Sequence, residues 1–241
     1  MRFQWIIGGE AGFGIMTTGL TFSKIVSRSG YYLIDYVEYP SLIRGGHNAY
    51  KVTIGDTPVY ALKDTVDLLV CLNKATFEIH KDKLDKNSVV IHDADEFVVD
   101  GGYMKIHVPF RKILSEGQGQ SIMKNTIALG ASLAAVGGDI KLLNGIISAQ
   151  FAKKGEKVVA FNTLFVKKGY DAVVENHKEL CRPVLTPKPV TDDQLVMTGN
   201  DAFALGAVIA DCKVYSAYPM TPSSSVLTTL ASWQEKAQIT G

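Results

Sequence analysis

The sequence predicts an α/β protein: a domain built on a largely parallel sheet, followed by the incomplete beginning of a second α/β domain. In the first half, short β-rich runs alternate with stretches of helical periodicity, which is typical of strand–helix–strand units. A proline-rich stretch interrupts this pattern, and a shorter version of it then begins again. We therefore expect a first domain over residues 1–180, a linker over 181–195 and the start of a second domain over 196–241.

The expected elements of the first domain follow from hydrophobic periodicity. The first strand, FQWIIGG, ends in glycine, and a helix follows it with apolar residues near helical spacing and Gly30 as its C-cap. Two continuous apolar runs, VDLLVCLN and NSVVIHD, indicate strands buried on both faces of a parallel sheet. The other expected strands are YYLIDYVEY, NAYKVTIG and YMKIHVP, and the other helices are KATFEIHKDKL, SIMKNTIALGASLAAVGG and IKLLNGIISAQFAKK. Right-handed crossovers would arrange these elements in three layers.

After the linker, the sequence predicts a small-residue helix in GNDAFALGAVIAD and a short strand in KVYSAY. A turn and another helix are expected next. About 45 residues cannot bury a self-sufficient α/β core. We therefore expect this region to be part of a longer subunit or to pack against something else.

Composition narrows the class of protein. Apolar residues make up 46% and charged residues 20%, with a net charge of +1, so nothing in the charge favours nucleic acid or an acidic membrane as partner. No apolar run approaches the roughly 18 residues that a membrane span needs, and the first residues, MRFQWIIGG, lack the long apolar segment expected of a signal peptide. Three separated cysteines, at 71, 181 and 212, cannot hold an iron–sulfur cluster by themselves. We expect a cytoplasmic protein.

A glycine-rich turn, GGEAGFG, joins the first strand to the first helix. Such a turn, with free N–H groups at a helix N-terminus, suits an anion such as a phosphate, although the glycines could equally serve the tight turn alone. The spacing of Gly9, Gly12 and Gly14 is the reverse of the dinucleotide fingerprint. Asp35 ends the second strand, where a ribose-binding acid could sit, but one match does not repair the glycine spacing.

A second motif, RGGHNA, lies in the loop between two strands. Arg44 could bind a carboxylate or phosphate, Gly45 and Gly46 would let the backbone approach it, and His47 could exchange a proton near neutral pH. The alternative is a solvated hairpin with an ordinary surface ion pair. The other histidines show no metal-ligand spacing and are expected at the surface or at strand edges: His80, His92, His107 and His177. Asn125 in KNTIALG could cap or cross-link its helix.

The most specific pattern is SAYPMTPSSSVLTTL. Pro219 and Pro222 stiffen the turn, and Thr221 stands where an N-cap belongs, with Pro222 at the first helical position. The helix would point the free N–H groups of Ser223 and Ser224 at the turn, forming a cradle for a small carboxylate. A plain helix cap is the alternative, and the two roles are compatible.

These motifs together resemble the 2-oxoacid:ferredoxin oxidoreductases over essentially the whole chain. Residues 1 to about 180, with GGEAGFG, RGGHNA and NTIALG, resemble the family's Rossmann-like gamma domain. Residues 196–241, with GNDAFALGA and YPMTPSS, resemble the start of its alpha domain, of the pyrimidine thiamine diphosphate type. The gamma-then-alpha order is similar to the fused large subunit of the two-subunit enzymes.

The resemblance implies oxidative decarboxylation of a 2-oxo acid to an acyl-coenzyme A, with electrons passing to ferredoxin. A beta subunit would hold most of the thiamine diphosphate with its Mg²⁺ and a [4Fe–4S] cluster, in a heterotetramer of two large and two small subunits. Thr221 would contact the substrate carboxylate, and the wall beside it would be formed by Tyr218, Pro219, Ser223 and Ser224. Coenzyme A phosphate binding or subunit packing is implied for Gly9, Gly12, Gly14, Arg44, Gly45, Gly46, His47 and Asn125.

Two other functions stay open beside this one. The chain could be a non-catalytic α/β module that only organises a partner subunit, or, less in keeping with its glycine spacing, a nicotinamide dehydrogenase. 2-Oxoglutarate is the first substrate expected, with pyruvate and branched-chain 2-oxo acids as alternatives. The family's acid that activates thiamine diphosphate falls beyond Gly241, so no catalytic base is assigned.

Overall fold

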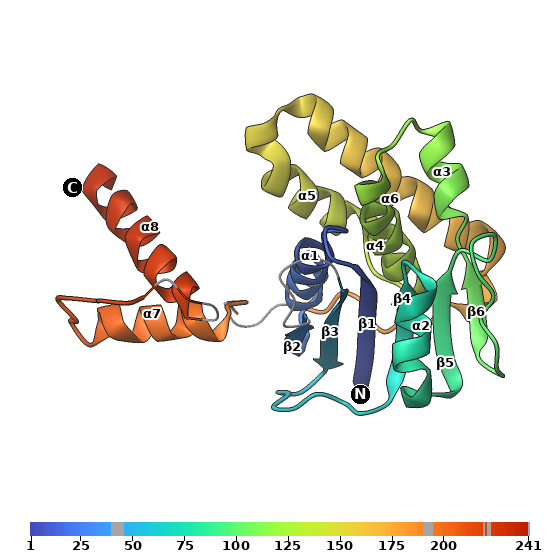
Figure 1. Ribbon diagram of the computed structural model, residues 1–241, viewed down its shortest axis with the longest axis horizontal. Coiled ribbons are helices and arrows are strands. Elements are labelled where there is room, and N and C mark those ends of the chain that lie inside the picture. Colours follow the sequence, from blue (N-terminus) through green and yellow to red (C-terminus); the bar gives the residue numbers. More distant parts are fainter. Residues whose placement is uncertain (40–45, 190–194, 219, 221–222, 241) are drawn as a thin grey trace. The chain divides into compact units, whose positions relative to one another are not determined.

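The computed structural model describes residues 1–39, 46–189, 195–218, 220 and 223–240. The chain forms two compact units, Met1–Asp193 and Gln194–Gly241. Figure 1 shows a sheet with helices in the first unit and a pair of helices in the second. Among the described residues, no helix combines the length and apolar character that crossing a bilayer requires.

The first unit is built on a six-stranded sheet in the order β2-β3-β1-β4-β5-β6. The strands are β1 (Arg2–Glu10), β2 (Tyr32–Glu38), β3 (His47–Gly55), β4 (Val66–Cys71), β5 (Leu84–His92) and β6 (Met104–His107). Neighbours from β1 to β6 are parallel, which confirms the mostly parallel α/β fold expected from the sequence. β3 instead runs antiparallel to both β1 and β2.

Alternation along the strands divides the core between the two faces of the sheet. Trp5 and Ile7 of β1 belong to the larger cluster, which is built with helices α1 (Ile15–Arg28), α4 (Lys124–Ala135), α5 (Ile140–Phe151) and α6 (Glu156–Asn176). Ile6 faces the other side and packs in a smaller cluster with Phe77 of α2 (Lys74–His80). Side chains at successive strand positions point to opposite faces, so both faces of β1 are covered.

Two helices of the first unit were not anticipated. α3 (Phe110–Glu116) is short, but α6 spans 21 residues and packs closely against α4. The α6 sequence contains several valines and Gly169, which lower intrinsic helix propensity, so its helical state depends on tertiary packing. Short 3₁₀ turns fill the remaining junctions: Lys81–Lys83, Ser121–Met123, Ala152–Lys154 and Lys178–Leu180.

The start of the expected linker is attached to the first unit. The N–H of Arg182 donates to the carbonyl of Ala135 at 2.7 Å, and the N–H of Leu185 donates to Val136 at 2.9 Å. Lys188 N–H donates to Ser29 at 3.1 Å, and the Leu185 side chain is fully buried. Residues 182–188 adopt no regular secondary structure, and these bonds make them structurally part of the first unit.

The second unit consists of α7 (Gly199–Ile209) and α8 (Ser224–Thr240). The strand expected at residues 213–218 is wrong, because residues 212–218 adopt no regular secondary structure. The described part of this unit contains no second strand to pair with, and an isolated strand has no partner for its backbone groups.

Candidate functional site

The glycine-rich turn lies between β1 and α1, as the sequence predicts. Gly12 and Gly14 have φ values of 96° and 70°, a region that side-chain-bearing residues rarely adopt. A Cβ on Gly12 would meet no atom, so this position needs glycine for its backbone conformation alone. A Cβ on Gly14 would in addition collide with the amide nitrogen of Asn125. Gly14 is the N-cap of α1 and leaves the first turn of that helix without a side-chain cap.

Asn125 ties the glycine turn to α4. Its Nδ2 donates to the carbonyl of Phe13 at 2.8 Å, and its Oδ1 accepts from the hydroxyl of Thr126 at 3.0 Å. Asn125 therefore cross-links α4 to the glycine-rich turn, through the backbone of Phe13. Residues 13 and 125 come together only in the folded chain.

The second motif reaches the same turn from β3. The carbonyl of Gly46, whose φ is 89°, accepts from the N–H of Ala11 at 3.1 Å, and His47 pairs with Glu10 across the β1–β3 ladder. The structure thus gathers Gly9, Gly12, Gly14, Gly46, His47 and Asn125 around one turn. Arg44 and Gly45 lie outside the described residues.

His47 lies against a second histidine that the sequence did not connect with it. The Nε2 atoms of His47 and His80 are 3.3 Å apart, so one ring donates to the other. His80, at the end of α2, is buried, so its expected position at the surface or at a strand edge is wrong; His92 is buried as well, as the last residue of β5. Burial and the neighbouring His47 lower the pKa of His80 to about 4. Burial also lowers the pKa of His47, so both rings are neutral at neutral pH.

The turn occupies the position where open α/β sheets bind ligands. β1 and β4 are parallel neighbours, and the helices that follow them, α1 and α2, pack in clusters on opposite faces of the sheet. The carboxyl ends of two such strands form a crevice at a topological switch point. Gly8 and Gly9 lie at this end of β1, where neighbouring side chains leave no room for a larger residue. A Cβ on Gly8 would come within 2.7 Å of His47, and a Cβ on Gly9 within 3.2 Å of Leu72.

Asp35 is already used inside the fold. Its Oδ2 accepts from the hydroxyl of Tyr50 at 2.6 Å and from the hydroxyl of Ser23 at 2.7 Å. Burial and this bond to Asp35 raise the pKa of the Tyr50 hydroxyl, which therefore stays protonated and donating. This carboxylate oxygen of Asp35 links α1 and β3 to β2. Because Asp35 was the only acid that suggested a ribose-binding site, the argument for such a site is lost.

In the second unit, part of the predicted hydroxyl turn can be placed. Tyr218 is highly exposed within this unit, and Ser223 donates its hydroxyl to the carbonyl of Met220 at 3.1 Å. The N–H of Ser224 donates to the carbonyl of Met220. The expectation that this N–H would be free is therefore wrong. α8 begins at Ser224, two residues after the predicted start at Pro222. Pro219, Thr221 and Pro222 lie outside the described residues.

Polar contacts join the start of α7 to α8. Thr198 and Asp201 form a capping box, in which the bond from the Thr198 hydroxyl lowers the pKa of Asp201. The other oxygen of Asp201 accepts from Thr229 at 3.0 Å, and Asn200 donates to Ser225 at 2.6 Å. The Asn-Asp pair of the GNDAFALGA motif therefore joins the first turn of α7 to α8.

Two further arrangements were not visible in the sequence. Asp93, Asp95 and His107 approach one another at the ends of β5 and β6. Both carboxylate oxygens of Asp93 accept hydrogen bonds from backbone N–H groups, one from Asp95 and one from Arg111, each at 3.1 Å. A structural role therefore accounts for this carboxylate.

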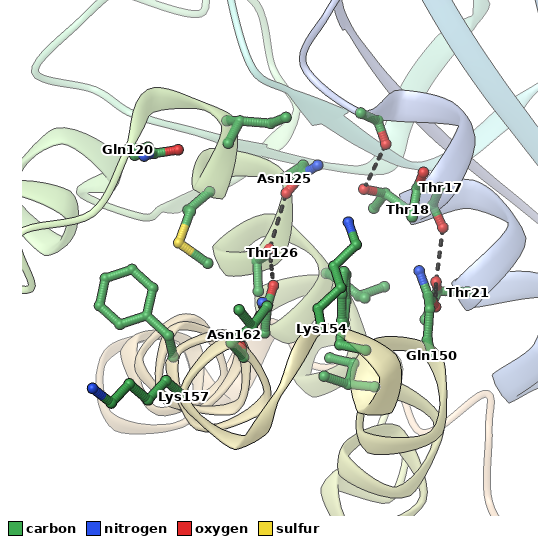
Figure 2. A pocket seen from close by; sticks show the side chains of 18 of the residues that line it. Thr17, Thr18, Thr21, Gln120, Asn125, Thr126, Gln150, Lys154, Lys157 and Asn162 are labelled. Atoms are coloured by element: carbon green, nitrogen blue, oxygen red, sulfur yellow. Dashed lines mark hydrogen bonds between the residues drawn. The ribbon is translucent and has the colours of Figure 1, made fainter.

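The other arrangement is a cavity of about 860 Å³ between α1, α4, α5 and α6, next to the glycine turn (Figure 2). Its walls come from four helices, so no single motif signals it.

Comparison with known proteins places these features in one family. Residues 4–172 match the model for pyruvate ferredoxin/flavodoxin oxidoreductases. An alpha subunit of a 2-oxoacid:ferredoxin oxidoreductase from a Sulfolobus species is 26% identical over 93% of this chain and 41% of that subunit. A 2-oxoglutarate synthase subunit from Methanocaldococcus jannaschii is 25% identical over 73% of this chain and 96% of its own length.

Solved structures agree with this assignment. A 2-oxoglutarate:ferredoxin oxidoreductase from Magnetococcus marinus, solved with 2-oxoglutarate, coenzyme A and succinyl-CoA bound, has a TM-score of 0.89 and 28% identity over 98% of this chain and 42% of that chain. The gamma subunit of a keto/oxoacid ferredoxin oxidoreductase from Geobacter sulfurreducens shares the fold, with a TM-score of 0.63 and 21% identity over 73% of this chain and 98% of that chain.

The chain spans 41% of the length of the curated alpha subunits that it matches. The family match nevertheless runs through the whole sheet and into α6. The three motifs that meet at the glycine turn all lie inside the matched residues. The chain therefore belongs to the pyruvate ferredoxin/flavodoxin oxidoreductase family.

Proposed function

We propose that this chain is the gamma domain and the beginning of the alpha domain of a 2-oxoacid:ferredoxin oxidoreductase large subunit. The observation that carries the proposal is the similarity to the Magnetococcus enzyme, which extends over 98% of the chain and so includes both units. The similarity to the Sulfolobus alpha subunit likewise extends over 93% of this chain. The reaction would convert a 2-oxo acid and coenzyme A to an acyl-coenzyme A and carbon dioxide, reducing ferredoxin.

The residues present fit only part of such an active site. The three cysteines are unpaired and one, Cys71, is buried in the sheet, so the [4Fe–4S] cluster would belong to a beta subunit. Thiamine diphosphate, when bound with Mg²⁺, supplies the carbanion chemistry at the keto carbon. The contribution of this chain would be a wall that orients the substrate: the Thr221 hydroxyl binds the carboxylate, and Tyr218, Pro219, Ser223 and Ser224 exclude water beside it.

The glycine turn has a separate proposed role in the gamma domain. The cluster around Gly14, His47 and Asn125, with Arg44 and Gly45 nearby in sequence, would bind a coenzyme A phosphate or form a subunit contact. The tight bonding of the turn to Gly46 and Asn125 favours the contact, because a rigid surface loses little entropy on assembly. 2-Oxoglutarate is the substrate proposed first, and a cytoplasmic heterotetramer of two large and two beta subunits is the proposed assembly.

Reconstitution tests the proposal against the assembly-module alternative. The large subunit carrying this chain is assayed with coenzyme A and a viologen dye, alone and with its beta subunit, on 2-oxoglutarate, pyruvate and 2-oxoisovalerate. Turnover of one of these acids by the mixture, and by neither protein alone, is expected. No turnover of any of them by a complex that has assembled with bound thiamine diphosphate would leave the chain as a scaffold.

A further inference from the structure

The contact between His47 and His80 has no part in the proposed reaction. His47 is the first residue of β3 and His80 is the last residue of α2, so two elements that are 33 positions apart supply the rings. The Nε2 atoms are 3.3 Å apart while the ring centres are 5.4 Å apart, so the two nitrogens point toward each other. Imidazole nitrogen is the commonest metal ligand in proteins, and two of them converge here.

The separation of the two nitrogens matches that of two ligands in a tetrahedral metal site. With Zn–N bonds of about 2.0–2.1 Å, two ligand nitrogens of such a site are about 3.3–3.4 Å apart. The distance in the histidine pair is 3.3 Å, so small rotations of the rings would suffice to place an ion between them. The ion would take the place of the proton that the two rings share. Mg²⁺ and Ca²⁺ prefer oxygen ligands, so a pair of imidazoles selects a transition metal.

The protonation of the pair also suits a metal ion. Burial lowers the pKa of both rings, so each ring is neutral at neutral pH, and only neutral imidazole binds a metal. When Nε2 of a neutral ring binds an ion, the ring proton resides on Nδ1. Nδ1 of His47 has no hydrogen-bond partner among the described residues. Placing the proton on that atom therefore breaks no existing hydrogen bond.

The surroundings of the pair provide access and a compensating charge. His80 is buried but His47 is only half-buried, so solvent reaches the pair on the side of His47. Gly8 leaves room for the His47 ring, because a Cβ on Gly8 would come within 2.7 Å of it. Against the effect of burial, the charge of Glu38 acts to raise the pKa of both rings, and the same carboxylate binds the buried Lys51. A cation at the pair would therefore have a carboxylate near it to offset its charge.

The cluster of Asp93, Asp95 and His107 is less suited to a metal, although it has more members. Nδ1 of His107 accepts the N–H of Ala94 at 2.9 Å, so the proton of the neutral ring is on Nε2, the nitrogen that faces Asp95. Both oxygens of Asp93 already accept backbone N–H groups. Two of the three side chains in this cluster therefore have their ligand atoms engaged, whereas the histidine pair does not.

We propose that His47 and His80 bind a divalent transition-metal ion, Zn²⁺, through their Nε2 atoms. Water would complete the coordination, with Glu38 as the neighbouring carboxylate. The ion would join the start of β3, and with it the RGGHNA motif, to the end of α2. The inference goes beyond the proposed function, because that reaction needs no metal on this chain and the site would bind zinc whether or not the chain takes part in 2-oxo acid oxidation.

Calorimetric titration with ZnCl₂ tests the proposal on the large subunit carrying this chain, after its metals have been removed with EDTA. We expect a saturable equivalent of Zn²⁺ whose affinity falls at least about tenfold in His47→Gln and in His80→Gln, since each variant loses one ligand. His107→Gln is the matched control: it removes the histidine of the other cluster and should leave zinc binding unchanged. His47 is only half-buried, so His47→Gln tests the site with less risk to folding than the variant of the buried His80.

Melting followed by circular dichroism completes the test and verifies that each variant is folded. Zn²⁺, and not Mg²⁺, should raise the melting temperature of the wild type and of His107→Gln, because a ligand that binds only the native state stabilises it. No saturable zinc binding by the folded wild type, wild-type affinity in the folded pair variants, or loss of binding in His107→Gln would each overturn the proposal. Turnover of a 2-oxo acid is measured separately, so failure of the proposed reaction and failure of this site are distinguishable.

Discussion

Gly130 of α4 and Gly169 of α6 lie where the two helices cross. At each glycine, the backbone of the other helix occupies the space that a side chain would need. A Cβ on Gly130 would strike the carbonyl of Val166, and a Cβ on Gly169 would strike the carbonyl of Ile127. The two contacts are reciprocal, and both obstacles are backbone atoms, which cannot rotate away. This crossing holds together the two helices that form one wall of the cavity.

Replacing Gly169 by alanine should therefore destabilise the protein in spite of the better helix propensity of alanine. Overpacking against a fixed backbone costs about 1–3 kcal/mol or more, which exceeds the gain of about 1 kcal/mol from propensity. Urea unfolding followed by circular dichroism measures the difference. Gly145→Ala is the control: it lies in α5 with nothing within 4 Å of a Cβ, and should stabilise by roughly 0.5–1 kcal/mol. A stable Gly169→Ala protein would show that the helices can separate without cost.

The two turn glycines should respond differently to alanine. Gly12→Ala incurs only backbone strain, on the order of 1–2 kcal/mol, whereas Gly14→Ala adds a collision with the Asn125 amide. A double-mutant cycle with Asn125→Ala isolates the second effect. We expect Gly14→Ala to cost less in the Asn125→Ala background than in the wild type, and Gly12→Ala to cost the same in both. Identical behaviour of the two glycines would contradict the assigned role of Asn125.

The histidine pair should make stability fall in mild acid. The folded-state pKa of His80 is about 4 and its ordinary value is 6.5, so between these values the unfolded chain binds the extra proton. The free energy of unfolding then decreases as pH falls from 6.5 to 4, by on the order of 3 kcal/mol for this group. His80→Gln should flatten that slope, and His177→Gln, remote from the pair, should not. Denaturant midpoints measured at several pH values provide the comparison, and an unaltered slope in His80→Gln would remove the pair as the cause.

Thr221→Val should impair use of the 2-oxo acid in the assembled enzyme. Loss of a hydrogen bond to a carboxylate is worth about 1.5–3 kcal/mol, which corresponds to a roughly 10- to 100-fold fall in kcat/KM. Thr228→Val is the matched control, since its hydroxyl bonds only within α8, to Ser225. Kinetics that match the wild type in the Thr221 variant, with the melting temperature slightly lowered, would reduce Thr221 to a helix cap.

Much of the first unit could be predicted because its signals are local. Gly12 and Gly14 indicate a turn whose backbone needs positive φ. The apolar runs around Leu69 and Val90 are long enough to indicate buried strands. The direction of β3 could not be read in the same way, because alternation encodes faces and not orientation. The strand expected near Tyr215 was wrong since an apolar run becomes a strand only beside another strand.

The candidate site shows the same division between local and distant information. Its three motifs could be recognised separately, but their meeting depends on bonds from Gly46 to Ala11 and from Asn125 to Phe13, which join distant parts of the chain. The partnership of His47 with His80 and the cavity around Lys154 arise in the same way. Neither leaves a periodicity in the sequence, because each wall belongs to a different helix or strand.

The bonds at the glycine turn have a mechanical consequence. Gly46, just ahead of β3, and Asn125, at the amino end of α4, each hold this turn by one hydrogen bond, to backbone atoms only two residues apart, at Ala11 and Phe13. A push on either of them is transmitted through a peptide segment too short to absorb it. The glycine turn, Gly46 and the start of α4, which are spread over more than a hundred positions, therefore move as one rigid unit. A partner that binds to one of them would be sensitive to the conformation of all three.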